Sequence, residues 1–241
     1  MRVTNYLLGY KDMYIVQDTD MFNFSLDSVL LPNFVKLNES IKNILDIGCG
    51  NAPIPLILST KTNSKITGVE IQKEPYEMAL ESIKINNLED RIDIINDDIN
   101  NIYKNFKVGS FDLITCNPPF FKYTKSSNIN KNDYKTIARH EVKLNLEQIF
   151  EIAKYLLNNH GTIALVHRPE RLGDIITIMR NNGIEPKRVQ FVHPHIDKDA
   201  NIVLIEGKKS ANAGIKVLPP IISHTDDGEY TEEIKKFFEN N

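Results

Sequence analysis

The sequence predicts an α/β fold in which helices cover both faces of a doubly wound, mostly parallel sheet. Short runs rich in Ile, Leu and Val alternate with longer amphipathic runs, as in proteins built from repeated strand–helix–strand units. The last two apolar runs follow each other without a helix between them, so a seven-stranded sheet is expected to end with a reversed edge strand.

Seven short apolar runs, several of them rich in β-branched residues, are the expected strands. They cover residues 43–48, 65–71, 91–95, 111–116, 161–167, 187–193 and 201–207. Four amphipathic segments are the expected helices, and they begin near residues 53, 75, 145 and 169. In the second helix, apolar residues share one face at helical spacing: Tyr76, Ala79, Leu80 and Ile83. Asn145 is expected to cap the third helix.

The chain has 241 residues, a length that suits one domain with a small appendage. Residues 41–241 contain all the expected strands and form the domain. Residues 1–40 fit the strand–helix alternation poorly and are expected to form an N-terminal arm. The polar segment 121–143 also fits poorly and is expected to be a loop after the fourth strand.

The composition excludes several classes of protein. The 29 basic residues are outnumbered by 32 acidic ones, so any surface that binds nucleic acid must be local. Cys49 and Cys116 are too few for a disulfide framework and lack metal-ligand spacing, and no metal site is expected. No run approaches the roughly 20 apolar residues of a membrane span, and the start lacks the apolar core of a signal peptide. These features indicate no membrane partner and a cytoplasmic location.

The stretch LDIGCGNAPIP follows the first strand and is the first candidate for a ligand-binding loop. Open α/β sheets bind ligands beyond the carboxyl ends of their strands, and a glycine turn lets backbone approach a ligand closely. Pro53 stands where a dinucleotide fingerprint needs its third glycine, which argues against a nicotinamide dehydrogenase. Asp46, two residues before Gly48, suits a ligand with an amino group or a sulfonium more than a pyrophosphate.

Carboxylates also follow the second and third strands. Glu70 ends the second strand, 24 residues after Asp46, where it can accept hydrogen bonds from both hydroxyls of a ribose. Asp98 can accept a hydrogen bond from an adenine amino group, with Ile99 packing on the ring. Asp97 is the alternative to Asp98, and a solvated strand end or an Asp-rich turn is the simpler interpretation of these carboxylates.

The fourth strand ends in Asn-Pro-Pro-Phe, and this stretch carries the candidate chemistry. Pro118 and Pro119 restrict the backbone, so the Asn117 side chain and the Pro118 carbonyl can face one point. Two acceptors that converge on an NH2 group orient its nitrogen lone pair and favour the cationic nitrogen of a transition state. Phe120 offers a face for stacking a planar base or amide. A plain Pro-Pro strand stop is the simpler alternative.

The motifs DIGCG, GVEIQ and DLITCNPPF together resemble class I S-adenosylmethionine-dependent methyltransferases, which are Rossmann-like, and among them those that modify exocyclic or amide nitrogens. Further motifs, FSLDSVLL, NPPFF, ARHE, RPERL and GEYTEEI, extend the resemblance over nearly the whole chain. They are similar to the bacterial tRNA1(Val) (adenine-N6)-methyltransferase family. This resemblance implies S-adenosyl-L-methionine as cofactor and methylation of N6 of the adenosine next to the anticodon of valine tRNA.

The resemblance also implies roles for individual residues. Asp46, Gly48 and Gly50 would border the methionine part of the cofactor, Glu70 its ribose and Asp98 its adenine. The N-terminal arm would close over the cofactor and bond its amino-acid end, although a simple helix cap by Ser25 is the alternative. The full cofactor set is Ser25, Asp27, Asp46, Gly48, Gly50, Asn51, Glu70, Ile71, Asp98, Ile99 and Asn117.

Residues 117–120, which are Asn117, Pro118, Pro119 and Phe120, would hold the target adenine. The chain departs from the family pattern at two places. Ala52 stands where glycine is common, a small change that should leave the loop usable. Phe120 stands where tyrosine is frequent, and stacking survives without the hydroxyl.

The loop 121–143 interleaves basic and aromatic residues, as contact with a single-stranded RNA loop requires. A base in a folded tRNA must be turned out of its stack to reach Asn117. The residues expected to contact RNA are Lys122, Tyr123, Lys125, Lys131, Lys135, Arg139, Arg168 and Arg171. A solvated loop is the alternative for the lysines, while Arg168 and Arg171 either bind phosphate or pair with Glu170 and the following helix.

Other functions fit parts of this pattern. Asn-Pro-Pro-aromatic chemistry serves another RNA adenine or a glutamine amide of a protein release factor equally well, but the basic loop and the family motifs favour tRNA. A non-catalytic RNA-binding protein would keep the fold without the chemistry. The presence of all three candidate site residues argues against a non-catalytic RNA-binding protein: Asp46, Glu70 and Asn117.

Overall fold

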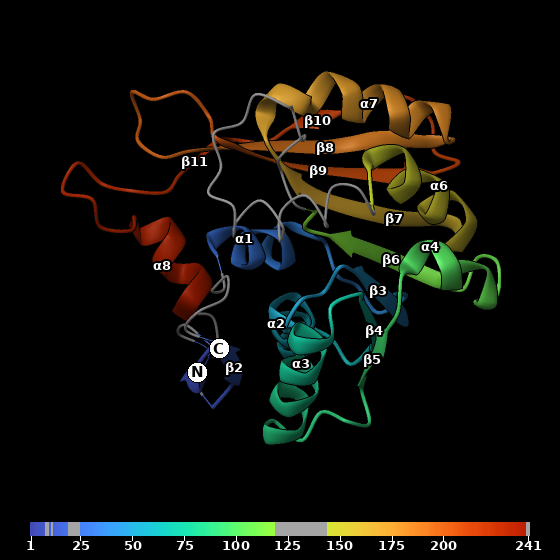
Figure 1. Cartoon of the computed structure of the whole chain (residues 1–241). Coiled ribbons are helices and arrows are strands. Elements are labelled where there is room, and N and C mark those ends of the chain that lie inside the picture. The colour runs from blue at the N-terminus through green and yellow to red at the C-terminus, as the bar shows by residue number, and fades with distance from the viewer. Residues whose placement is uncertain (8–9, 11, 19–24, 119–143, 240–241) are drawn as a thin grey trace, which may run out of the picture.

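The structure is a computed structural model, and it describes residues 1–7, 10, 12–18, 25–118 and 144–239. Within these residues, a two-stranded hairpin precedes a nine-stranded sheet. Figure 1 shows α4, α6 and α7 along one side of the large sheet and α1, α2 and α3 along the other. This is the layered arrangement of a doubly wound α/β fold.

The hairpin consists of β1 (Arg2–Tyr6) and β2 (Tyr14–Asp18). The strands of the large sheet are β3 (Asn43–Ile47), β4 (Lys65–Glu70), β5 (Ile92–Asn96), β6 (Phe111–Cys116), β7 (Leu157–His167), β8 (Ile184–His193), β9 (Ile202–Lys209), β10 (Lys216–Val217) and β11 (Ile221–Ile222). The α-helices are α1 (Leu26–Phe34), α2 (Pro53–Lys61), α3 (Lys73–Ile85), α4 (Ile99–Ile102), α6 (Leu146–Leu156), α7 (Leu172–Asn181) and α8 (Glu232–Glu239). Short 3₁₀ turns cover Tyr103–Asn105 and Pro169–Arg171.

The described strands of the large sheet run in the order β10-β8-β9-β7-β6-β3-β4-β5, and β11 also pairs with β8. Strands β3 to β7 pair in parallel with their neighbours among themselves. All seven expected strands are present, and the predicted doubly wound, mostly parallel sheet is confirmed.

The predicted place of the reversed strand is wrong. Strand β9 is antiparallel to both β7 and β8 and lies between them, not at the edge. Its four consecutive apolar residues, 202–205, are all buried, which suits a strand inside a sheet, whereas β8 alternates between buried and half-buried positions. Beyond β8, the two-residue strands β10 and β11 raise the described count from seven to nine. Strands of two residues are too short to show an alternating pattern.

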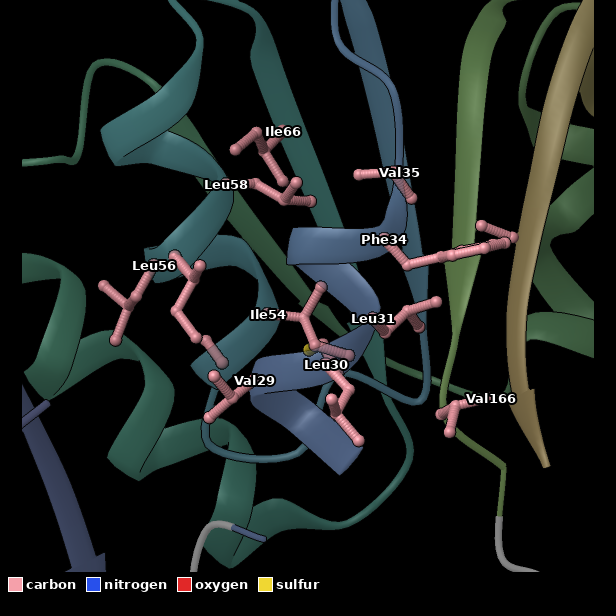
Figure 2. Close-up of a cluster of buried hydrophobic side chains, with 14 of the residues drawn as sticks. Val29, Leu30, Leu31, Phe34, Val35, Ile54, Leu56, Leu58, Ile66 and Val166 are labelled. Atoms are coloured by element: carbon pink, nitrogen blue, oxygen red, sulfur yellow. The ribbon is translucent and has the colours of Figure 1, made fainter. Parts of the chain in front are cut away.

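Alternate residues of the central strands divide the core into two layers. Ile44 packs in the layer that contains α1, α2 and α3, whereas the next residue, Leu45, packs in the layer that contains α4, α6 and α7. This alternation is the period-2 geometry of a strand that is buried on both faces. Figure 2 shows the first layer, where α1 and α2 place their apolar side chains against one another.

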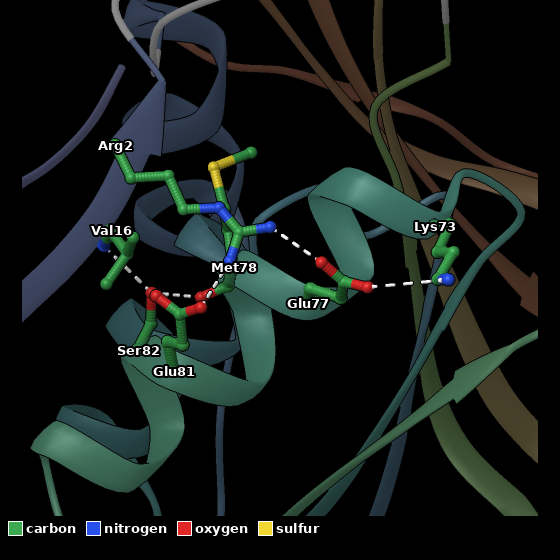
Figure 3. Close-up of polar contacts among 7 residues, drawn as sticks. All are labelled: Arg2, Val16, Lys73, Glu77, Met78, Glu81 and Ser82. Atoms are coloured by element: carbon green, nitrogen blue, oxygen red, sulfur yellow. Dashed lines mark hydrogen bonds and ion pairs between the residues drawn. The ribbon is translucent and has the colours of Figure 1, made fainter.

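The N-terminal hairpin packs on α3 (Figure 3). The Val16 backbone N–H donates to Ser82 Oγ at 2.9 Å, and Arg2 Nη2 forms an ion pair with Glu77 at 2.6 Å. Because the hairpin covers the Ser82 side of α3, that side is buried. Leu80, which was expected on the buried face, is 40% exposed.

The remaining helices follow their sequence signals. The predicted Asn145 cap of α6 is confirmed, because its Oδ1 accepts from the Gln148 backbone N–H at 2.9 Å. The Asn145 backbone N–H in turn donates to Gln148 Oε1 at 2.9 Å, which completes a capping box. At the C-terminus, α8 packs against α1 and β11. Among the described helices, none combines the length and the apolar character that crossing a membrane requires.

Candidate active site at the carboxyl edge of the sheet

The parallel strands β3 to β7 end at one edge of the sheet, and the predicted site residues that the structure describes lie at or just beyond their ends. The order β6-β3-β4 places the reversal of winding between β3 and β6. Ligands of doubly wound sheets bind beyond the carboxyl ends of the strands at such a point. Asp46 of β3 and Thr115 of β6 are paired in register, so the glycine loop and Asn117 follow the ends of neighbouring strands.

The glycine loop turns sharply through three positive φ angles. Gly48 and Gly50 have φ of 70° and 57°, and Ala52, which precedes α2, has φ of 69°. The Gly48 N–H donates to the Val69 carbonyl of β4 at 2.9 Å, which holds the turn against the sheet. An alanine in this left-handed conformation costs on the order of 1 kcal/mol more than glycine, so the departure at Ala52 carries strain that the sequence did not reveal.

Asp46 is 1% exposed and has an incomplete set of hydrogen bonds. Its Oδ1 accepts from Thr115 Oγ1 at 2.6 Å, while its Oδ2 is buried without a partner in the described part of the chain. Burial raises the pKa of Asp46 to about 7; the Thr115 hydrogen bond opposes this rise and the nearby Glu70 charge adds to it. Buried polar atoms are normally hydrogen-bonded, so the unpartnered Oδ2 of Asp46 can accept from a ligand donor. A cationic donor would favour the ionised carboxylate.

Glu70 is buried and bridges two loops. Its Oε2 accepts from the Gly50 N–H at 2.9 Å, and its Oε1 accepts from the Gln72 N–H at 2.7 Å. The carboxylate therefore holds the glycine loop against the turn that leads into α3. The interpretation as a solvated strand end is wrong, because Glu70 is 4% exposed. Each oxygen has a second lone pair with which it can accept a ligand hydroxyl.

Asp98 caps α4. Its Oδ1 accepts from the backbone N–H and the side-chain amide of Asn100, both at 2.9 Å. Asp97 is exposed, and its Oδ1 accepts from the Asp98 N–H at 2.7 Å. Ile99 is buried in the second core layer. Local structure thus accounts for the carboxylate of Asp98, and its contact with an adenine stays a prediction.

Asn117 follows β6 and is half-buried, next to the buried Pro118. Its Nδ2 donates to Ser28 Oγ of α1 at 3.4 Å. Sequence reasoning gave Ser28 no role in the site. Several predicted site residues lie outside the described residues: Pro119, Phe120, Lys122, Tyr123, Lys125, Lys131, Lys135 and Arg139.

The first turn of α1 lies close to the end of β7. Burial raises the pKa of Asp27, and the positive charge of Arg168 opposes this rise, as does the Ser25 hydroxyl. Ser25 Oγ donates to Asp27 Oδ2 at 3.3 Å and does not cap the helix, so the simple Ser25 cap is wrong. Arg168 Nη1 donates to the Asn201 carbonyl at 2.8 Å, in the loop between β8 and β9. The fold thus brings the charges of Asp27 and Arg168 close to one another, although the two residues are 141 positions apart in the sequence.

Other predicted residues have structural partners. Arg171 Nε pairs with Asp174 of α7 at 2.8 Å, which agrees with the alternative of pairing to the helix. The side chain of Asn51 donates to the Val16 carbonyl at 2.9 Å and so joins the glycine loop to β2. Ile71 is half-buried just after β4. Among the described residues, no three His, Cys, Asp or Glu side chains gather in a way that could hold a metal ion.

Sequence comparison identifies related proteins over most of the chain. A family model described as the methyltransferase small domain matches residues 25–173. The tRNA1(Val) (adenine(37)-N6)-methyltransferase of Flavobacterium psychrophilum is 26% identical over 231 residues, which cover 94% of this chain and 95% of that protein. The enzyme of the same name from Tolumonas auensis is 29% identical over 198 residues, which cover 81% of this chain and 80% of that protein.

Solved methyltransferase structures share the fold. A predicted O-methyltransferase from Agrobacterium tumefaciens has a TM-score of 0.69 at 18% identity, over 88% of this chain and 95% of that one. Geranyl diphosphate C-methyltransferase from Streptomyces coelicolor, solved with Mg²⁺, geranyl diphosphate and S-adenosyl-L-homocysteine, has a TM-score of 0.58 at 11% identity and covers 76% and 79%. The predicted class I methyltransferase fold is therefore confirmed.

Proposed function

The chain belongs to the methyltransferase small domain family, and from this premise we propose that it methylates N6 of an adenosine in tRNA, with S-adenosyl-L-methionine as methyl donor. The observation that carries the proposal is Asn117, whose amide lies at the carboxyl end of β6 next to Pro118. The names of the relatives from Flavobacterium and Tolumonas support adenine in tRNA as the acceptor.

The residues of this chain act on the acceptor by positioning and by hydrogen bonding. The Asn117 Oδ1 and the Pro118 carbonyl accept the two N–H groups of the adenine amine, which turns its nitrogen lone pair toward the cofactor. An aromatic amine is a poor nucleophile, and these two acceptors stabilise the positive charge that develops on its nitrogen. Phe120 stacks on the base. The proton released from nitrogen passes to water.

The glycine loop and the adjoining strand ends would hold the cofactor. The buried, unpartnered Oδ2 of Asp46 fits an ammonium group, and Glu70 fits a ribose through the second lone pairs of its oxygens. When bound, S-adenosylmethionine supplies an electrophilic methyl group that passes to the adenine nitrogen and leaves a neutral thioether. The further contacts are assigned to Ser25, Asp27, Gly48, Gly50, Asn51, Ile71, Asp98 and Ile99.

The proposed substrate is valine tRNA, methylated at the adenosine next to the anticodon. The relatives' names, which specify tRNA1(Val) and adenine 37, support this choice. The sequence of the 121–143 segment, with its basic and aromatic residues, supports this choice, because an overall acidic protein needs a local positive surface to contact RNA. A tRNA substrate also supports a cytoplasmic location.

Methyl transfer to defined acceptors tests this function. Labelled S-adenosylmethionine is incubated with unmodified valine tRNA, other tRNAs, ribosomal RNA and a protein release factor in parallel, and the labelled products are digested and identified. N6-methyladenosine from valine tRNA alone is expected. Label in the release factor would move the acceptor to a glutamine amide, and N6-methyladenosine in ribosomal RNA alone would overturn the tRNA assignment.

Asn117→Ala tests the assigned chemistry within the protein. The variant should keep its affinity for S-adenosylmethionine within a few-fold and lose most of its turnover, because the lost acceptor contacts the reacting amine. Calorimetric titration of the cofactor and single-turnover methylation of valine tRNA measure the two quantities. Equal losses of binding and turnover would contradict the assignment of Asn117 to the methyl acceptor.

A further inference from the structure

The edge of β2 that faces away from β1 is bound by side chains. The Tyr14 N–H donates to Asn86 Oδ1 at 2.8 Å, and Asn86 Nδ2 donates to the Tyr14 carbonyl at 2.7 Å. Two residues later, the Val16 N–H donates to Ser82 Oγ at 2.9 Å (Figure 3). The Val16 carbonyl accepts from Asn51 Nδ2 at 2.9 Å. Four backbone groups of this strand edge thus have side-chain partners.

The bond from Asn51 differs from the other three in its origin. Ser82 lies in α3 and Asn86 is the C-cap of that helix, whereas Asn51 belongs to the glycine loop. The orientation of the Asn51 amide in this contact is unambiguous, because a carbonyl oxygen accepts hydrogen bonds and never donates them. The Asn51 side chain therefore joins the glycine loop to a strand that lies 35 residues earlier in the sequence.

The Val16 carbonyl is held in one place by its surroundings. Ile15 and Val16 are 1% and 2% exposed, and Ile15 packs in the first core layer. Ser82 Oγ donates to the Met78 carbonyl at 2.8 Å, so its oxygen is left to accept from the Val16 N–H. Close packing around a strand leaves its backbone little freedom, and β2 can serve as a fixed support for Asn51.

Adjacent residues of the glycine loop are bound from two sides. The Gly50 N–H donates to Glu70 of β4, and the Asn51 side chain donates to Val16 of β2. Three residues of this loop have positive φ angles, which belong to neither helices nor strands. The shape of the loop therefore depends on contacts with other segments, and β2 supplies one of them.

We propose that Asn51 is a positioning residue through which the N-terminal hairpin fixes the glycine loop in the shape that binds S-adenosylmethionine. This inference rests on the proposed function, because it requires the glycine loop to hold the cofactor. It gives Asn51 a task separate from the cofactor contact assigned above. Coupling between two equilibria is reciprocal, so cofactor binding should in turn hold the hairpin on α3.

Amide hydrogen exchange of the Val16 N–H measures this coupling. The group is bonded to Ser82, and it exchanges when the hairpin leaves α3. Saturating S-adenosylmethionine should slow its exchange about 5-fold in the unaltered chain, the effect of one hydrogen bond on an equilibrium. In Asn51→Ala, also saturated with the cofactor, the slowing should be less than about 2-fold. A lost cofactor contact alone would not remove it.

Asn86→Ala is the matched control, because Asn86 also donates from its amide to a carbonyl of β2 but lies outside the glycine loop. This variant should speed the exchange of the Val16 N–H in the ligand-free protein and keep the 5-fold slowing by the cofactor. Equal slowing in Asn51→Ala and the unaltered chain would overturn the proposal. Loss of the slowing in both variants would also overturn it, because a loosened hairpin would then be sufficient.

A second variant guards against misfolding of Asn51→Ala. Asn51→Asp keeps the size of the side chain but offers the Val16 carbonyl no donor at neutral pH, so it should lose the slowing as well. Retention of the slowing in Asn51→Asp would contradict the proposal.

Three outcomes separate this inference from the proposed function. If the cofactor slows exchange as expected but no tRNA is methylated, the inference stands and the assigned acceptor fails. If valine tRNA is methylated while Asn51→Ala keeps the slowing, the inference alone fails. If S-adenosylmethionine does not bind the unaltered chain, both fail.

Discussion

The end of β3, which leads into the glycine loop, and the loop after β5 both place carboxylates near the same edge of the sheet, but these carboxylates differ in hydrogen bonding. Asp46 is buried, and its Oδ2 has no partner in the described part of the chain, whereas Asp98 uses its Oδ1 to hold Asn100. Local capping of α4 explains an aspartate at position 98. The buried Oδ2 of Asp46, which lacks a hydrogen-bond donor, costs free energy until a ligand supplies one. Unmet hydrogen bonding is therefore stronger evidence for a ligand than position at a strand end.

The largest expected effect of this difference is on the pH dependence of stability. The pKa of Asp46 is raised from 3.8 to about 7, so the folded state binds this proton more tightly than the unfolded state does. The contribution of Asp46 is most favourable at low pH and falls by about 4 kcal/mol as the pH rises from 3.8 to about 7, at about 1.4 kcal/mol per pH unit. Asp46→Asn should flatten this part of the curve of unfolding free energy against pH.

Urea unfolding of the ligand-free proteins across this pH range measures the effect. Asp98→Asn is the matched control, because Asp98 sits at the same sheet edge, is half-buried and uses its carboxylate in a cap. Its curve should keep the slope that comes from Asp46. If Asp46→Asn and the unaltered chain show the same slope, burial does not raise the pKa of Asp46 to about 7. The contrast between Asp46 and Asp98 then disappears.

The next effect is on cofactor affinity. Asp46→Asn should raise the Kd for S-adenosylmethionine by about 100-fold, because a charged hydrogen bond is worth about 1.5–3 kcal/mol. In the unaltered chain, affinity should fall about tenfold for each pH unit below 7, since binding requires the ionised carboxylate. Calorimetric titration measures both. Asp98→Asn should change the Kd by less than about 10-fold. An equal loss of affinity in both variants would mean that Asp46 and Asp98 contribute equally to cofactor binding.

A smaller effect is expected on the stability supplied by the second loop. Asp98→Ala removes the cap of α4 and should reduce the free energy of unfolding by about 1 kcal/mol. Asp97→Ala is the control, because Asp97 is exposed and caps no helix, and it should cost less than about 0.5 kcal/mol. Urea unfolding separates the two. A larger cost for Asp97→Ala would show that the turn, not the cap, is what this loop supplies.

The sequence predicted the features of the fold that arise locally. Strands β3 to β9 are at least five residues long and each contains several apolar residues, so their pattern identifies them. Asn145 is followed three residues later by Gln148, so capping chemistry identifies the start of α6. The insertion of β9 between β7 and β8 depends on pairing between distant segments. The hairpin of β1 and β2 was missed because every residue of β1 is half-buried or exposed, and a strand without a buried face leaves little pattern.

In the site, too, some features could be predicted from the sequence and others could not. Asp46, Glu70 and Asn117 could be predicted to lie near one another because parallel strands end at one edge. The bond from Glu70 to the glycine loop, the contact of Ser28 with Asn117, and the approach of Asp27 to Arg168 join residues 20 to 141 positions apart. Such contacts arise from tertiary packing, and no spacing in the sequence predicts them.

The smallest expected effect concerns strain in the glycine loop. Ala52→Gly relieves an unfavourable φ of 69° by about 1 kcal/mol but removes a buried methyl group of similar value, so the free energy of unfolding should change by less than about 1 kcal/mol. Ala79→Gly in α3 removes an equally buried methyl group and also loses about 1 kcal/mol of helix propensity, so it should cost about 2 kcal/mol. Urea unfolding of both variants makes the comparison. A cost of about 1 kcal/mol or more for Ala52→Gly, which is the value of the buried methyl group alone, would mean that Ala52 sits in its turn without strain. Asp98 has an ordinary φ of −80°. The two regions would then differ in the hydrogen bonding of Asp46 and Asp98 rather than in backbone strain.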